Sequence, residues 1–134
     1  AGGAPEIAAH ARQTFVMLKA TPRSFVPKLD FRTSAGFLEG HGVRSATGAR
    51  GGGPGKVITD FGLLAPQDGS QELELAALFA DATVEEARAA VGWPLRIGTR
   101  VERIGPPTAT ELETLRALQA RTREAHNRPV HVPA

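Results

Sequence analysis

The sequence of 134 residues contains no cysteine and no tyrosine, and it has a single tryptophan. Without cysteine, the chain can form neither a disulfide framework nor a thiolate metal site. This composition is compatible with the cytoplasm, where we expect the protein to reside. No apolar run approaches the roughly 20 residues of a membrane span, and no stretch has the form of a signal peptide. We therefore expect no membrane partner.

The chain also lacks a strong excess of charge of either sign. Sixteen Lys and Arg residues face 14 Asp and Glu residues, so the formal net charge is only +2. The arginines are spread along the sequence; only Arg121 to Arg128 approach a cluster, and no aromatic residue lies among them. Because a basic footprint and a stacking platform are both missing, we expect no nucleic-acid partner. The length predicts one domain with a genuine core.

Familiar catalytic and metal-binding motifs are missing as well. The four histidines are His10, His41, His126 and His131. No two of them have the spacing of metal ligands, so we expect no metal. No serine stands in a Gly-x-Ser-x-Gly elbow. The neighbouring carboxylates at Glu85-Glu86 and at Glu111 and Glu113 fall at helix starts, where such groups serve caps and dipoles. The motifs therefore identify no catalytic side chain.

A glycine cluster, Gly51-Gly52-Gly53-Pro54-Gly55, runs directly into the apolar segment Lys56 to Leu64. Gly55-Lys56 suggests a phosphate-binding loop, which requires Gly, four residues and then Gly-Lys-Ser/Thr before a helix. Here Arg50 occupies the first glycine position, Val57 follows the lysine, and β-branched residues stand where the helix should begin. The cluster is therefore interpreted as a structural junction between a loop and a strand.

Residue patterns predict the remaining elements along the chain. The first part is expected to contain a helix beginning at Pro5 and a buried strand over Gln13 to Lys19. An extended segment over Ser24 to Phe31 and a loop over Thr33 to Gly55 should follow. The last element of this part is one strand over Lys56 to Leu64, in which Gly62 forms a bulge. The second part is expected to contain a turn at Asp68-Gly69 and a strand over Glu72 to Leu78. A helix capped by Thr83 and Glu86 should follow and end before Gly92, and a short extended piece should cover Trp93 to Ile97. The last helix should be capped by Thr108 and Glu111, with Leu112, Leu115 and Leu118 along one face.

The best candidate for a binding site is Gly2-Gly3-Ala4, at the start of the first helix. Backbone N–H groups at a helix start can hold an anion or a developing oxyanion, and glycine allows a ligand to approach the backbone. In α/β proteins a strand normally precedes such a turn. We therefore expect Ala1 to be an internal point of a longer polypeptide.

Several segments, taken in order, resemble the β subunit of family I CoA-transferases of the glutaconate and 3-oxoacid types. Gly2-Gly3-Ala4-Pro5-Glu6-Ile7-Ala8 resembles the family motif Gly-Gly-Ala-x-Asp-Ile/Leu-Ala. The other similar segments are Ser24 to Leu38, Gly51 to Leu64, Ala82 to Arg88, Gly92 to Leu95, and Pro106-Pro107-Thr108 with Glu111-Leu112. Two departures are Glu6 in place of Asp, and Phe79-Ala80-Asp81 in place of His-Pro-Gly. Each motif alone is weak, but their common order is specific.

The resemblance implies a CoA-transferase-like α/β fold, with residues 1–126 as the C-terminal part of a β-subunit domain and residues 127–134 as a flexible tail. It implies acyl-CoA as substrate, with coenzyme A transferred and no metal required. The implied partners are an α subunit and the upstream half of the β subunit. The nucleophilic glutamate of the family is expected upstream, so this chain would contain no catalytic residue. Gly2, Gly3 and Ala4 would bind CoA or the oxyanion, with the backbone around Gly2 and Gly3 facing the thioester carbonyl.

Two other functions remain open at this point. A protein of the same scaffold can hydrolyse a CoA ester instead of transferring CoA. A non-catalytic assembly domain would bind no acyl-CoA, even with its partners present.

Overall fold

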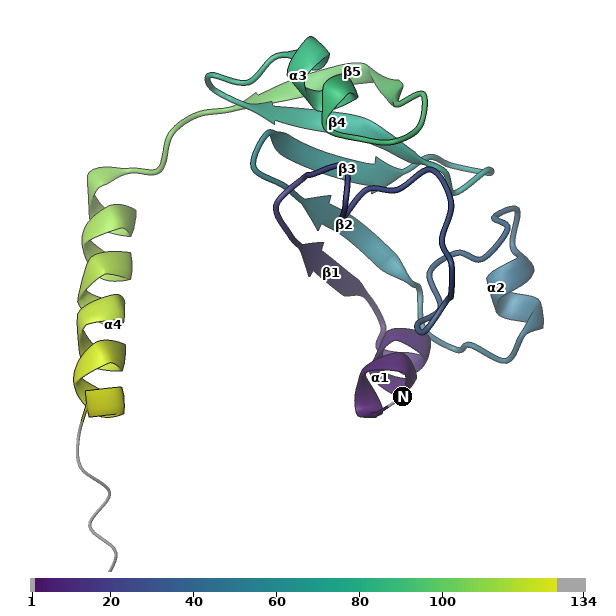
Figure 1. Cartoon of the computed structure of the whole chain (residues 1–134), viewed down its shortest axis with the longest axis horizontal. Coiled ribbons are helices and arrows are strands. Elements are labelled where there is room, and N and C mark those ends of the chain that lie inside the picture. The colour runs from purple at the N-terminus through teal and green to yellow at the C-terminus, as the bar shows by residue number, and fades with distance from the viewer. Residues whose placement is uncertain (1, 128–134) are drawn as a thin grey trace, which may run out of the picture. The chain divides into compact units, whose positions relative to one another are not determined.

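The computed structural model describes residues 2–127, and the chain divides into two compact units, Ala1–Ile104 and Gly105–Ala134. The first unit contains, in chain order, α1 Gly3–His10, β1 Thr14–Met17, α2 Val43–Ala46, β2 Pro54–Ile58, β3 Gly62–Pro66, β4 Leu73–Phe79, α3 Val84–Ala89 and β5 Arg96–Ile104 (Figure 1). The second unit contains α4 Ala109–Asn127. Strands and helices combine in one unit, which confirms the predicted α/β class.

The five strands form one mixed sheet in the order β1-β2-β3-β4-β5. The strands β1 and β2 are parallel, β2, β3 and β4 run antiparallel in succession, and β4 and β5 are parallel. A parallel pair needs a crossover connection. The helix α3 supplies it between β4 and β5, and the long segment containing α2 supplies it between β1 and β2.

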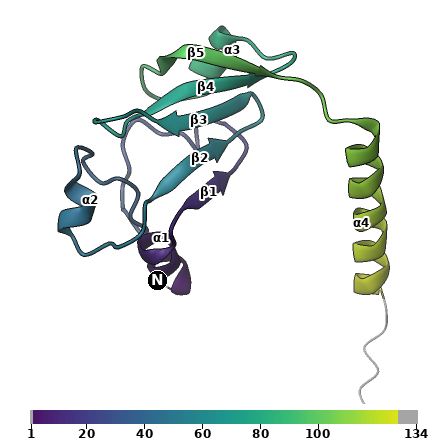
Figure 2. The ribbon, with the colours of Figure 1, turned by 180° about the vertical axis from the view of Figure 1, so that it is seen from behind.

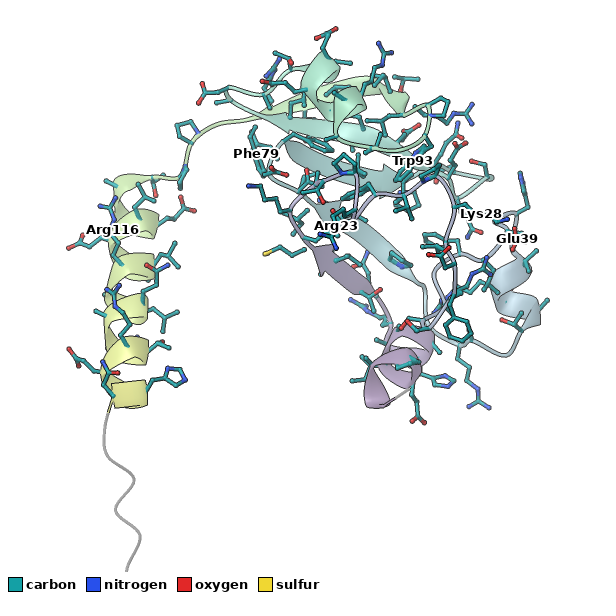
Figure 3. All side chains as sticks on the ribbon, viewed as in Figure 1. Arg23, Lys28, Glu39, Phe79, Trp93 and Arg116 are labelled. Atoms are coloured by element: carbon teal, nitrogen blue, oxygen red, sulfur yellow. The ribbon has the colours of Figure 1, made fainter. Side chains whose placement is uncertain are left out.

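The core lies against one face of the sheet, where α3 and the segment that follows β1 cover the strands (Figures 1 and 2). Leu64, Leu75 and Leu78 of the central strands are fully buried there. Phe25, from the segment after β1, packs on Trp93 with 5.7 Å between the ring centroids; Trp93 is labelled in Figure 3. Burial of these large apolar side chains stabilises the unit.

The strand predicted over Gln13 to Lys19 forms as β1, but the prediction that it is buried is wrong. Phe15, Val16 and Met17 are 61%, 40% and 77% exposed. The reason is position: β1 is at one end of the strand order and pairs only with β2. Its apolar composition is that of a central strand, whereas in the part of the chain that the structure describes it is an edge strand.

The segment Ser24 to Phe31 is not extended as predicted but forms turns and bends. Local hydrogen bonds explain the difference. The Ser24 Oγ donates to the Lys19 carbonyl at 2.8 Å, and the Thr21 N–H donates to the Ser24 Oγ at 2.9 Å. Such side-chain to backbone bonds compete with strand pairing. The turn directs Phe25 into the core.

The prediction of a single strand over Lys56 to Leu64 is also wrong, because two antiparallel strands, β2 and β3, form there. Thr59, which is buried, closes the turn between them. Its Oγ1 donates to the Gly62 carbonyl at 2.8 Å and accepts from the Gly62 N–H at 3.0 Å. Gly62 begins β3, where a Cβ atom would collide with the Ala77 carbonyl oxygen. The close approach of β4 therefore requires glycine at this position.

The structure confirms the predicted turn at Asp68-Gly69 and the predicted cap of α3. The Asp68-Gly69 turn connects β3 and β4, closed by a 2.8 Å bond from the Gln67 N–H to the Glu72 carbonyl. The capping box of Thr83 and Glu86 is present at the start of α3. Two predictions were incomplete. A one-turn helix, α2, interrupts the predicted loop over Thr33 to Gly55. The short extended piece predicted over Trp93 to Ile97 leads into a nine-residue strand, β5. Both depend on contacts with distant segments.

The second unit begins its helix as predicted. The Thr108 N–H and Oγ1 both donate to the Glu111 Oε2, at 2.7 and 2.8 Å, and the Glu111 N–H donates back to the Thr108 Oγ1 at 3.3 Å. Leu115 and Leu118 on α4 are about half exposed, at 49% and 51%. The helix continues to Asn127, the first residue of the predicted tail. The rest of that tail lies outside the described residues.

The cap of α4 predicts a dependence on pH. Hydrogen bonds from the Thr108 backbone and hydroxyl lower the pKa of Glu111 below its ordinary value of 4.5. Folding therefore favours the charged carboxylate, so the cap stabilises the helix above pH 4.5, and this contribution is lost as the pH falls through the lowered pKa. Hydrogen exchange of the Leu112 amide, which donates to the Thr108 carbonyl, should lose protection over that range.

The substitution Glu111→Gln should reduce the protection at neutral pH and remove most of its pH dependence. Glu113→Gln is the matched control, because Glu113 lies in the same turn and makes none of the cap's hydrogen bonds. Equal behaviour of the two variants would contradict the assignment of the cap to Glu111.

Candidate functional site

Among residues 2–127, no side chain caps the N-terminal end of α1. Gly2 occupies the N-cap position. Gly2, Gly3 and Ala4 are exposed, and a Cβ atom at Gly2 or Gly3 would meet nothing within 4 Å. The first N–H groups of a helix have no partner within the helix and carry the positive end of its dipole. This end of α1 can therefore accept an anion or a carbonyl oxygen.

A groove of about 440 Å³ begins beside this helix end. Its walls come from α1, from β1 and from the loop at residues 34–36. The lining residues are Ala4, Ile7, Ala8, Thr14, Phe15, Val16, Ser34, Ala35, Gly36 and Pro54. Most of these side chains are apolar, and the hydroxyls of Thr14 and Ser34 are the polar groups. An apolar groove with a few polar groups is typical of sites for organic ligands.

Behind the groove, Arg44 is 4% exposed. Its guanidinium uses all five N–H groups, and every acceptor is a backbone carbonyl. The Nη2 donates to Ala8 and Ala9 at 2.7 and 3.0 Å, the Nη1 to Ala35 and Gly36 at 3.1 and 2.7 Å, and the Nε to Gly51 at 2.9 Å. The carbonyls of Ala8 and Ala9 belong to the C-terminal turn of α1, where the dipole favours a cation. Arg44 therefore joins α1, the loop at 34–36 and the glycine cluster.

The glycine cluster packs directly on the end of α1 and the start of β1. The Gly51 N–H donates to the Ala9 carbonyl at 2.9 Å, and the Gly52 N–H donates to the Arg12 carbonyl at 3.0 Å. A Cβ atom at Gly52 would lie 2.6 Å from that Arg12 oxygen. These N–H groups are engaged within the protein, so they are not free to hold a phosphate. The interpretation of the cluster as a structural junction fits this arrangement.

The structure places the predicted site residues at one end of the groove: Ala4 lines it, while Gly2 and Gly3 precede it at the open helix end. Sequence patterns did not identify Arg44 or residues 34–36 as neighbours of that site. For residues 34–36 a signal existed, since Thr33-Ser34-Ala35-Gly36 lies within a segment that resembles the CoA-transferase family. Arg44 has no comparable signal, because its acceptors are separated from it by 7 to 36 residues.

Neither a metal cluster nor a membrane-spanning helix is found in the described part of the chain. Among residues 2–127, no group of three or more His, Asp or Glu side chains could hold a metal ion. In that same range no helix is both long and apolar enough to cross a membrane.

Comparison with known proteins gives two relatives. The chain is 44% identical to the β subunit of 3-oxoadipate CoA-transferase from Pseudomonas knackmussii over 126 residues, which are 94% of this chain and 48% of the relative. It is 33% identical to the β subunit of glutaconate CoA-transferase from Acidaminococcus fermentans over 109 residues, 81% of this chain and 41% of the relative. The chain thus spans about half the length of the curated relatives that it matches. No protein-family model matches it.

The fold gives a consistent result. The crystal structure of glutaconate coenzyme A-transferase from Acidaminococcus fermentans superposes with a TM-score of 0.77 and 29% identity, covering 86% of this chain and 44% of the other. Similarity of sequence and of fold therefore point to the same group of proteins.

The junction between the glycine cluster and α1 makes a prediction about stability. A Cβ atom at Gly51 would collide with the Ala11 carbonyl oxygen and lie 3.0 Å from that of Ala9. The substitution Gly51→Ala should lower the free energy of unfolding by about 1–3 kcal/mol, as overpacking does. Urea denaturation of the 134-residue chain measures the change.

Gly36→Ala is the control, because Gly36 also adjoins Arg44 but a Cβ atom there meets nothing within 4 Å. That variant should stay within about 0.5 kcal/mol of the unchanged chain. A Gly51→Ala variant as stable as Gly36→Ala would disprove the close packing of this junction.

Proposed function

Since the chain belongs to the family of CoA-transferase β subunits, we propose that it forms part of an enzyme that transfers coenzyme A between an acyl-CoA and a carboxylic acid. The observation that carries the proposal is the 44% identity, over 94% of this chain, to the β subunit of a CoA-transferase. The reaction passes through a glutamyl-CoA intermediate, and the reacting glutamate lies outside this chain. We place the enzyme in the cytoplasm.

The chemistry needs a site that stabilises negative charge on oxygen. A glutamate carboxylate attacks the thioester carbonyl of the acyl-CoA, and the carbonyl oxygen becomes an oxyanion. The C–S bond then breaks, leaving a mixed anhydride and a CoA thiolate. The thiolate attacks the glutamyl carbonyl, which releases the first carboxylic acid and leaves the enzyme as a CoA thioester. A second carboxylate accepts the CoA through the same steps in reverse.

Gly2, Gly3 and Ala4 are the residues that we propose for the oxyanion. The support is the open, uncapped end of α1, with space around both glycines. Preorganised N–H donors aimed at a developing oxyanion give one of the largest contributions to catalysis. The apolar groove beside Ala4 would then hold the part of the acyl-CoA next to the thioester.

We propose two protein partners: the upstream half of the β subunit and an α subunit. The relatives are β subunits, and they are about twice as long as the matched part. The free edge of β1 suits the upstream half. The N–H groups of Thr14 and Leu18 donate toward β2, so those of Phe15 and Met17 point to the open edge, where another strand can pair.

The uncovered face of the sheet supports the same partner. Met17 pairs with Ile58, Ile58 with Leu63, and Leu63 with Ala77, so these four residues form an apolar row across four strands. Directly paired residues share one face of a sheet. Met17 is 77% exposed in this row, Ile58 and Leu63 are partly exposed, and Ala77 is buried. We assign the row and the β1 edge to the upstream half of the β subunit, which would complete the sheet.

The test uses the complete β subunit that contains this chain, together with its α subunit. The enzyme is incubated with acyl-CoA, with and without a carboxylic acid such as 3-oxoadipate or glutaconate. We expect a new acyl-CoA only when the acid is present, and a mass increase of CoA on a glutamate of the β subunit. Release of free CoA without any acid would instead indicate a hydrolase. An assembled complex that neither binds acyl-CoA nor gains mass would indicate a non-catalytic assembly domain.

The oxyanion assignment predicts opposite results for two substitutions at one position. Gly3 is the first residue of α1, where proline is well tolerated. Gly3→Pro removes one N–H donor and should lower kcat by about 100-fold, the usual cost of losing an oxyanion donor. Gly3→Ala keeps the N–H, and its methyl group meets nothing within 4 Å. That variant should retain activity close to that of the unchanged enzyme.

Steady-state kinetics of both variants in the complete enzyme measures the difference. If Gly3→Pro is as active as Gly3→Ala, this N–H does not stabilise the oxyanion. If both variants lose activity equally, the position matters for access of the ligand and not for donation.

A further inference from the structure

Arg44 links two walls of the groove, α1 and the loop at 34–36. Three of its five acceptors are carbonyls of groove-lining residues: Ala8 on α1, and Ala35 and Gly36 on the facing loop. Among the described residues, every hydrogen bond found between α1 and the loop at 34–36 runs through this guanidinium. The direct hydrogen bonds between these two walls therefore all come from one side chain.

We infer that Arg44 is a positioning residue for CoA transfer, which holds the open end of α1 and the groove in the geometry that the reacting thioester requires. This inference rests on the function proposed above. Arg44 itself lies behind the groove and is not placed to touch the substrate. It acts through the backbone of Ala8, Ala35 and Gly36, which it fixes in place.

The chemistry of the side chain explains why arginine occupies this position. A buried charge is costly unless it is fully hydrogen-bonded. The planar guanidinium has five N–H donors in a rigid fork, so it can bind carbonyls from three segments at once. A lysine has three donors on one nitrogen and can serve fewer acceptors. The carbonyls at the C-terminal end of α1 also supply the negative end of the helix dipole.

Neighbouring residues hold Arg44 itself in position. Its carbonyl accepts from the Thr47 Oγ1 at 2.8 Å, while Gly42, the N-cap of α2, donates its N–H to the Gln71 Oε1 at 3.1 Å. The Cδ atom of Arg44 would lie 3.4 Å from a Cβ atom placed at Gly53. The turn of α2 thus fixes the backbone of Arg44, and the glycine cluster lies against its side chain.

The first experiment compares Arg44→Lys with the matched control Arg88→Lys in the complete two-subunit enzyme. Arg88 is exposed on α3. Active sites are counted as the fraction of β subunits that gain the mass of CoA after long incubation with acyl-CoA. We expect Arg44→Lys to lower kcat per counted site by about 100-fold, because a small misplacement of reacting groups has this effect. The KM for acyl-CoA should change much less, and Arg88→Lys should change neither.

Counting sites separates positioning from a purely structural effect. A variant that is only partly folded has fewer active sites, but each remaining site keeps its kcat. An Arg44→Lys enzyme whose kcat per site equals that of the Arg88→Lys control would overturn the inference.

The second experiment measures hydrogen exchange in the complete two-subunit enzyme, without any activity assay. The Gly51 amide, bonded to the Ala9 carbonyl that Arg44 also binds, should exchange about tenfold faster in Arg44→Lys, because local opening becomes easier. Amides of β4 should be unchanged. Unchanged exchange at Gly51 would overturn the inference, since the walls would then not depend on Arg44.

Failure of the proposed function and failure of the inference give different results. If the unchanged enzyme transfers no CoA, the proposed function fails and the inference fails with it, whatever the exchange shows. If the unchanged enzyme is active and Arg44→Lys keeps its kcat per site, only the inference is overturned.

Discussion

The arrangement around the candidate site depends on one buried guanidinium. Arg44 binds five carbonyls from α1, the loop at 34–36 and the glycine cluster. Because this side chain lies at the C-terminal end of α1, its charge complements the negative end of the helix dipole. Among the described residues no side chain caps the opposite end, which we propose as the oxyanion site. The eight-residue helix α1 thus has its C-terminal end bound by an arginine, while no described side chain caps its N-terminal end.

The sheet is strongly asymmetric. Leu64, Leu75 and Leu78 bury fully against α3 and the segment after β1, whereas Phe15 and Met17 stay exposed at the β1 edge. An exposed apolar edge strand invites pairing with another strand. The chain spans about half the length of its relatives, and we propose that the remaining part of a β subunit covers that edge.

Much of the local structure was predictable from the sequence, because its causes lie within a few residues. The capping boxes at Thr83 and Thr108 and the turn at Asp68-Gly69 each depend on hydrogen bonds over a short separation. The predictions failed where local patterns were ambiguous. The β-type residues from Lys56 to Leu64 fit one strand as well as two, and only the buried bonds of Thr59 show where the chain reverses.

The sequence by itself determined the α/β class, the helix caps and, through the order of its motifs, the resemblance to CoA-transferase β subunits. Only the tertiary structure revealed the groove beside Ala4 and the binding of Arg44 to the carbonyl of Ala8, 36 residues away. The physical reason is that backbone carbonyls are identical in every residue. A sequence shows where an arginine stands, but only the folded chain shows which carbonyls converge on it.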